Sequence, residues 1–196
     1  MLEIRTQQTA FYFLTYGDLI MRRSSIMHAR VGVLLGHPGV RVTNPVARVE
    51  LEDCTLHGCG TGLDGGSLSM WRELIARRCT FEQNGVAIRG TDIRYHLLDR
   101  CRFIGNQVAI QADGVRTCPA GGCPWWELLS FDILGCHFAD NAEHLRLVSS
   151  SSGSTNLRAE LWHDTFVGGG PVFTTAASGS EPAEVRVRSS ALFAGG

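Results

Sequence analysis

The 196-residue sequence predicts an all-β solenoid of about seven coils, in which each repeat adds short strands to the strands of the repeat before it. Two observations predict this fold. A short motif recurs seven times at intervals of 22 to 35 residues, and apolar columns keep a constant distance from that motif. Repeats of this size are typical of solenoids, because one repeat is too small to bury its own apolar face.

The recurring motif consists of a small or polar residue, any residue, and then a large apolar residue, here named the anchor. The seven copies are Ser24-Ser25-Ile26, Cys54-Thr55-Leu56, Cys79-Thr80-Phe81, Cys101-Arg102-Phe103, Cys136-His137-Phe138, Asp164-Thr165-Phe166 and Ser190-Ala191-Leu192. Glycine, asparagine and aspartate recur between and after the predicted strands, where they favour turns. Insertions in such turns explain why the spacing varies.

Two columns precede the anchor by five and seven residues and a third follows it by seven; all are apolar except for one histidine in the second. The first column is Met21, Leu51, Ala76, Leu98, Ile133, Leu161 and Val187. The second is Leu19, Val49, Leu74, His96, Phe131, Ala159 and Val185, and the third is Val33, Leu63, Ile88, Ile110, Leu145 and Phe173. A separation of two residues on one face is the period of a β-strand. Stacked repeats would pair these strands in parallel, as a single-stranded parallel β-helix. The leucine spacing and helical return leg of a leucine-rich repeat are absent.

The repeat domain is predicted to span residues 17–196, with residues 1–16 as a degenerate first coil or an N-terminal extension. Ile4 lies 22 residues before Ile26, which favours the degenerate coil. The last repeat stops where a second strand is expected, and no amphipathic helix precedes the first full coil. Because uncapped strand edges pair with other chains, we expect either a segment of a longer protein or end-to-end self-association.

Composition excludes several classes of function. The 18 cationic residues are all arginine and are balanced by 19 acidic residues, so the net charge is −1. Nucleic acid is therefore not an expected partner. The absence of lysine excludes a Walker-type phosphate loop and a Schiff-base lysine. Neither a signal peptide nor a transmembrane segment is predicted, so no membrane partner is expected and the compartment stays unknown.

Four cysteines occupy the small-residue column two positions before the anchor. They are Cys54, Cys79, Cys101 and Cys136. A small side chain is needed where the chain bends between strands, and buried thiols behave as small hydrophobes, so we expect a buried, reduced stack. Cys54, His57 and Cys59 resemble part of a zinc site but lack an obvious fourth ligand, and no metal is expected there.

Cys118 and Cys123 lie in an insertion that runs from Asp113 to Pro124. A short disulfide in an oxidising compartment and a pair of free thiols are equally compatible with this sequence.

Function is expected on outward positions, six and four residues before the anchor. The predicted binding strip consists of Glu50, Glu52, Arg77, Asp99, Asp132, Glu160 and Trp162. Carboxylates accept hydrogen bonds from sugar hydroxyls, and an indole covers a pyranose face. Two carboxylates at a suitable separation could also cleave a glycosidic bond. The alternative is a solvated sheet face whose charges contribute only solubility.

Four segments carry a resemblance to a known family: VELEDCTLHGCGTGLDGGS, ELIARRCTFEQNGVAIRG, LLDRCRFIGNQVAIQADG and ELWHDTFVGGGPVF. Over residues 17–196 the chain resembles right-handed parallel β-helix repeat proteins of the pectate-lyase-like superfamily. The resemblance implies a right-handed coil. It does not select a function, because the family includes lyases, hydrolases, epimerases, phage tailspikes and scaffolds.

Lyases of this family use an arginine base and aspartates that hold calcium. Arg77, with Glu52 and Asp99 in neighbouring repeats, is the nearest match, but the dense aspartate cluster and the aspartate pairs of the hydrolases are absent. We therefore expect a non-catalytic β-helix module that presents an extended face to carbohydrate or a protein partner. The alternatives are a polysaccharide lyase or glycoside hydrolase, and a structural scaffold. No cofactor is expected, and calcium would be needed only by a lyase.

Overall fold

The computed structural model describes residues 2–5, 8–13, 18–35, 47–65, 72–91, 95–113, 129–149, 157–177 and 184–193. Within these ranges the chain forms 22 β-strands and no helix, arranged as a parallel β-helix of about seven coils. This confirms the predicted all-β fold. The described residues include no helix that is long and apolar enough to span a membrane.

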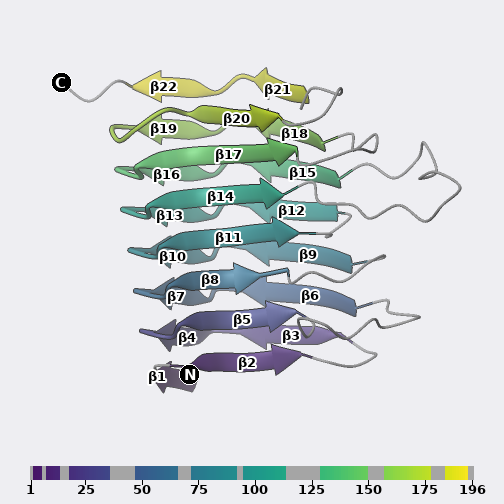
Figure 1. Cartoon of the computed structure of the whole chain (residues 1–196), viewed down its shortest axis with the longest axis vertical. Helices are drawn as coiled ribbons and strands as arrows, with labels where there is room; N and C mark the ends of the chain where they lie inside the picture. Colours follow the sequence, from purple (N-terminus) through teal and green to yellow (C-terminus); the bar gives the residue numbers. More distant parts are fainter. Residues whose placement is uncertain are drawn as a thin grey trace, which may run out of the picture.

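Three parallel sheets form the walls of the solenoid (Figure 1). Sheet A contains β1 (Leu2–Arg5), β4 (Ser24–Met27), β7 (Thr55–His57), β10 (Thr80–Glu82), β13 (Arg102–Ile104), β16 (His137–Ala139), β19 (Thr165–Val167) and β22 (Ala191–Phe193). Sheet B contains β2 (Thr9–Phe13), β5 (Val31–Leu35), β8 (Thr61–Asp64), β11 (Val86–Thr91), β14 (Val108–Asp113), β17 (Glu143–Ser149) and β20 (Phe173–Ala177). Sheet C contains β3 (Leu19–Arg22), β6 (Ala47–Glu52), β9 (Arg72–Arg77), β12 (Tyr95–Asp99), β15 (Leu129–Leu134), β18 (Leu157–Trp162) and β21 (Glu184–Arg188).

Each coil runs through sheet C, then sheet A, then sheet B, before the chain enters the next coil. In Figure 1 the chain passes rightwards along the front strands, returns leftwards behind them and rises from the N-terminus to the C-terminus. This winding is right-handed, as the resemblance implied.

The strand register reproduces the apolar columns. Phe81, for example, pairs with Leu56 below it and Phe103 above it in sheet A. The columns before the anchor lie in sheet C and the column after it lies in sheet B. The apolar columns lie in two strands of each coil, and the anchor occupies a third, short strand of its own.

Left-handed turn residues isolate this short anchor strand. The residue three positions before each anchor has a positive φ, and only one of the seven is glycine: Arg23, Asp53, Arg78, Arg100, Gly135, His163 and Ser189. Non-glycine residues adopt this conformation infrequently. The sharp bend between sheets C and A was therefore not evident from residue type.

The first strands of the chain align with the repeats that follow. Strand β1 pairs with β4, with Ile4 opposite Ile26, and β2 pairs with β5. Residues 2–5 and 9–13 therefore occupy sheet positions equivalent to those of the later coils.

The anchors from Ile26 to Phe166 are buried and form one column of the core. Four phenylalanines, Phe81, Phe103, Phe138 and Phe166, stack with ring centroids 5.0, 4.8 and 4.7 Å apart and nearly parallel planes. This spacing matches the separation of neighbouring strands. One aromatic column therefore follows the axis of the solenoid and fixes the register of the coils.

The cysteine column lies at the bend between sheets C and A. Cys54, Cys79, Cys101 and Cys136 are buried and free, as predicted. The thiol of Cys101 donates to a carbonyl in the coil below, and its backbone amide donates to Sγ of Cys136 in the coil above, at 3.3 Å. The column therefore satisfies backbone groups that the bend leaves outside the strand ladders. Cys118 and Cys123 lie outside the described residues.

An asparagine ladder satisfies backbone groups in the same way at the bend between sheets A and B. Oδ1 of Asn84, Asn106 and Asn141 each accepts a hydrogen bond of 2.9 Å from a backbone amide in the coil below. Nδ2 of each asparagine donates to a backbone carbonyl of that lower coil. The ladder ends where Nδ2 of Asn141 contacts Nδ1 of His144, at 3.2 Å.

Candidate functional site

The outer face of sheet C brings the predicted strip together. Strand pairing places Glu52, Arg77 and Asp99 side by side on neighbouring strands. Asp132 lies beside Glu160 in the next column. All seven strip residues therefore share one face, spread over the five strands from β6 to β18.

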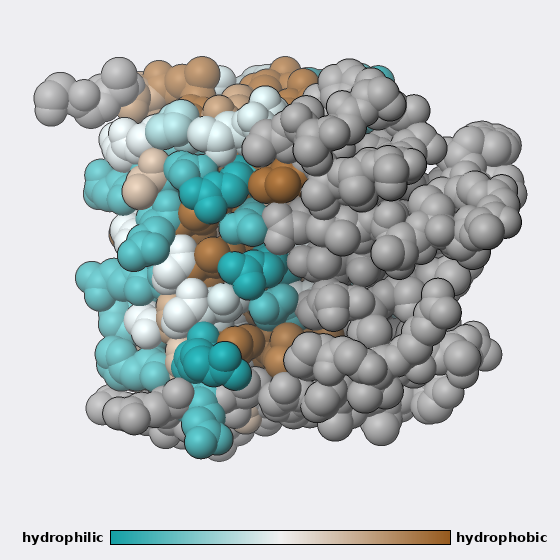
Figure 2. Space-filling model, viewed as in Figure 1, coloured by the Kyte–Doolittle hydropathy of each residue, from teal (hydrophilic) through white to brown (hydrophobic). Residues whose placement is uncertain are grey.

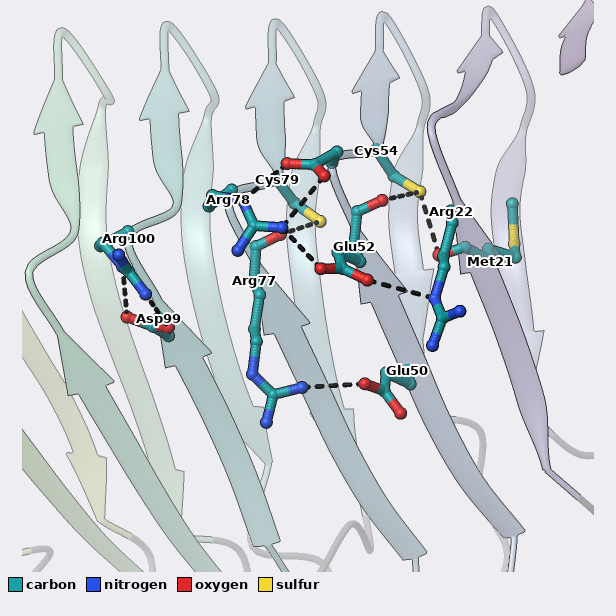
Figure 3. A network of polar contacts seen from close by, with 11 residues as sticks. Met21, Arg22, Glu50, Glu52, Cys54, Arg77, Arg78, Cys79, Asp99 and Arg100 are labelled. Carbon is teal, nitrogen blue, oxygen red and sulfur yellow. Dashed lines mark hydrogen bonds and ion pairs between the residues drawn. The ribbon is translucent and has the colours of Figure 1, made fainter. Parts of the chain in front are cut away.

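Arginines bind the carboxylates at the N-terminal half of this face (Figure 3). Oε1 of Glu50 lies 2.9 Å from the guanidinium of Arg77. Glu52 contacts two arginines, Arg22 at 3.1 Å and Arg78 at 2.6 Å. Each of these carboxylates therefore binds an arginine on a neighbouring strand or turn rather than pointing toward a common centre.

Turn residues extend this network toward sheet A. Nε of Arg78 donates to Asp53 at 2.8 Å, and this hydrogen bond is the main cause that lowers the pKa of Asp53. Arg100 contacts Asp99 at 3.0 Å. These pairs are partly exposed, and such pairs contribute little to stability.

The three weak catalytic candidates therefore share a face without converging on one point. Arg77 binds Glu50, whereas Glu52 binds arginines of other coils and Asp99 binds Arg100.

A second network surrounds Trp162 at the C-terminal half of the face. Glu160 contacts Arg158 and, at 3.7 Å, Arg186, and the indole Nε1 of Trp162 donates to Glu160 at 3.4 Å. Burial raises the pKa of Glu160, but the bonds from Arg158 and Trp162 and the arginine charges outweigh burial, so its pKa lies below the ordinary value. The guanidinium of Arg188 lies 4.4 Å from the centroid of the indole ring. One face of the predicted sugar platform is therefore covered.

Asp132 differs from the other strip carboxylates, because the described residues provide it with no arginine partner. Its neighbour is Tyr95, whose phenol pKa is raised first by burial and then by the charge of Asp132 and a hydrogen bond to it. The flanking residues in its own column are Leu97 and Glu160. Sequence reasoning missed Tyr95, because only the columns six and four before the anchor were considered, although the position eight before it also faces outward.

No group of three or more histidine, cysteine, aspartate or glutamate side chains among the described residues is arranged to hold a metal ion. In the zinc-like fragment, Cys54 and Cys59 are buried free thiols, whereas Nδ1 of His57 lies 3.5 Å from Glu82 on the outer face of sheet A.

Two buried ionisable groups lie away from this face. Asp164 occupies the cysteine column, and its Oδ2 has no hydrogen-bond partner; burial raises its pKa to about 7. His96 stacks on Phe131 with centroids 3.7 Å apart, and burial lowers its pKa to about 3. The sequence register already placed both residues in inward columns, but their protonation behaviour depends on the surrounding core.

Comparison of the chain with protein-family models, curated proteins and solved structures found no match. The fold defines a parallel β-helix repeat protein.

Proposed function

We propose that the chain is a non-catalytic β-helix module of the pectate-lyase-like type, and that the outer face of sheet C binds carbohydrate. The observation that carries this proposal is the position of Asp132. It lies on β15, between Tyr95 on β12 and Trp162 on β18, and lacks an arginine partner among the described residues.

This arrangement suits the recognition of a sugar. A carboxylate that is not held by arginine can accept hydrogen bonds from two hydroxyl groups, while an adjacent aromatic ring covers the apolar face of a pyranose. Because Arg188 covers one face of the Trp162 indole, Tyr95 is the better stacking platform. Trp162 would contribute the apolar edge of its ring.

The ion pairs of the face favour binding over catalysis. A lyase or hydrolase needs a group whose protonation changes during the reaction. Each of the three catalytic candidates forms an ion pair at 2.6–3.1 Å; these candidates are Glu52, Asp99 and Arg77. Their role under this proposal is to keep the face flat and its side chains ordered.

A glycan array tests the proposal, followed by an ultraviolet assay for unsaturated uronates and a reducing-sugar assay. We expect the wild-type protein to bind at least one class of oligosaccharide without turnover. Turnover that is lost in Arg77→Ala would instead establish the enzymatic alternative. Absence of binding to every glycan would contradict the proposal and favour a protein partner or a scaffold role.

A further inference from the structure

Among the described residues, the last coil exposes part of the apolar core. Val187 is 46% exposed, whereas Leu161, which precedes it in the same column, is fully buried. Leu192 and Phe193 in β22 are 62% and 59% exposed. In Figure 2 apolar residues correspondingly lie along the upper end of the molecule, where Figure 1 places β21 and β22.

We propose that strand β21 pairs antiparallel with β21 of a second copy of this chain, across a two-fold axis that passes through Arg186. Among the described residues, β21 is the last strand of sheet C and pairs only with β18. A free strand edge is a ready template for another strand. A two-fold arrangement uses the same patch on both copies and closes at a dimer.

The backbone of β21 fits this pairing. The carbonyl of Arg188 accepts a hydrogen bond of 3.1 Å from the amide of His163, so it points toward the coil below. Successive residues of a strand direct their amides and carbonyls to opposite edges, so those of Val185 and Val187 point toward the uncovered edge. In the proposed register Val185 lies opposite Val187 of the second copy, and the two residues exchange both backbone hydrogen bonds.

The side chains fit the same register. Glu184 lies opposite Arg188 of the second copy, and symmetry repeats this ion pair on the other side of the axis. Val185 and Val187 face inward, so the apolar face continues across the interface. The two copies of Arg186 meet at the axis, where the contacts of each with Glu184 at 2.8 Å and Glu160 at 3.7 Å reduce their repulsion.

Charge also argues against head-to-tail stacking. The sheet C strand at the N-terminal end is β3, whose outward positions are Ile20 and Arg22, and Asp18 precedes it in the same alternation. A parallel copy in the common register would place Glu184 beside Asp18 and Arg188 beside Arg22. Like charges directly opposite one another destabilise strand pairing, so the antiparallel register is favoured.

Sedimentation velocity over roughly a hundredfold range of protein concentration tests the proposal, because a dimer responds to concentration by mass action. The wild-type protein should shift from monomer to dimer and form nothing larger. Val187→Pro should remain monomeric, because it removes the amide that donates across the axis and leaves the bonds to β18 intact.

The charge register is tested separately. Glu184→Arg should weaken the dimer, and Glu184→Arg combined with Arg188→Glu should restore it. Glu73→Arg makes the same change in the same outward column of β9, away from the end, and should have no effect. A wild-type protein that stays monomeric, open polymers, or a double variant that fails to restore the dimer would each overturn the proposal. If Val187→Pro does not fold, as judged by circular dichroism, the charge variants decide the outcome.

Discussion

The side chain of Asp164 continues the cysteine column, because its Oδ1 accepts a hydrogen bond of 2.6 Å from the backbone amide of Cys136. Its other oxygen, Oδ2, is buried and has no partner. The carboxyl of Asp164 therefore accepts a backbone hydrogen bond at the position where other repeats have a thiol or a hydroxyl. Because Oδ2 is buried without a partner, the ionised form of this carboxyl is disfavoured.

Asp164 should make stability fall as pH rises. Its pKa is about 7 in the folded state against 3.8 for the free group. The folded state therefore binds more protons than the unfolded state between these values, and stability declines across this window by up to about 4 kcal/mol before levelling off above pH 7.

Asp164→Asn keeps the acceptor for the Cys136 amide but cannot ionise. The difference in free energy of unfolding between the wild type and this variant, from urea titrations at pH 4 to 8, isolates the contribution of Asp164. A difference that does not change with pH would show that the carboxyl is solvated in the folded protein.

His96 should have the opposite effect across nearly the same pH range. Burial lowers its pKa from 6.5 to about 3, so the unfolded state binds the proton more readily. Stability should therefore fall as pH decreases from about 6.5 toward 3. His96→Leu fills a similar volume and should reduce this acid sensitivity in thermal melts, and an unchanged pH profile would argue against a buried neutral imidazole.

Asn106 should be important for stability although it contacts no ligand. Its side chain accepts from the amide of Asn84 at 2.9 Å and donates to the carbonyl of Phe81 at 3.0 Å. Asn106→Ala leaves these buried groups unpaired, so we expect a loss of about 2–4 kcal/mol in the free energy of unfolding. Gln107→Ala, at the exposed next position, is the matched control and should cost less than about 0.5 kcal/mol.

The cysteine stack should be chemically inert in the folded protein. A hydrogen bond with the thiol of Cys101, together with burial, raises the pKa of Cys79 to about 12. Because the thiolate is the reactive form, an alkylating reagent should modify Cys54, Cys79, Cys101 and Cys136 only after denaturant is added. Peptide mass spectrometry identifies the labelled positions, and rapid native labelling of Cys79 would contradict the register.

The fold could be predicted from the sequence because its determinants repeat. Anchors such as Phe81 and Phe103 recur in columns, and one register explains all of them. The conformation of the turns and the contacts of the site were harder to predict from the sequence. A left-handed conformation at Arg78, and its bonds to Glu52 and Asp53, depend on side chains about 25 residues away that meet only after coiling.

The contacts of the binding strip were likewise not predictable from the sequence. Alternation identified its outward residues, but it could not distinguish Asp132 from Glu52, because only the folded structure reveals which carboxylates bind arginine. Nor could alternation predict that Arg188 would cover the ring of Trp162.

The most direct test of the proposed function is a calorimetric titration of an array-selected oligosaccharide into the wild type, Asp132→Asn and Tyr95→Ala. Glu82→Gln on the outer face of sheet A is the control. We predict that each sheet C substitution weakens binding by roughly 5- to 150-fold, the effect of losing about 1–3 kcal/mol of contact, with no change in melting temperature. Equal affinity of the wild type and Asp132→Asn would contradict the assignment of this face as the carbohydrate site.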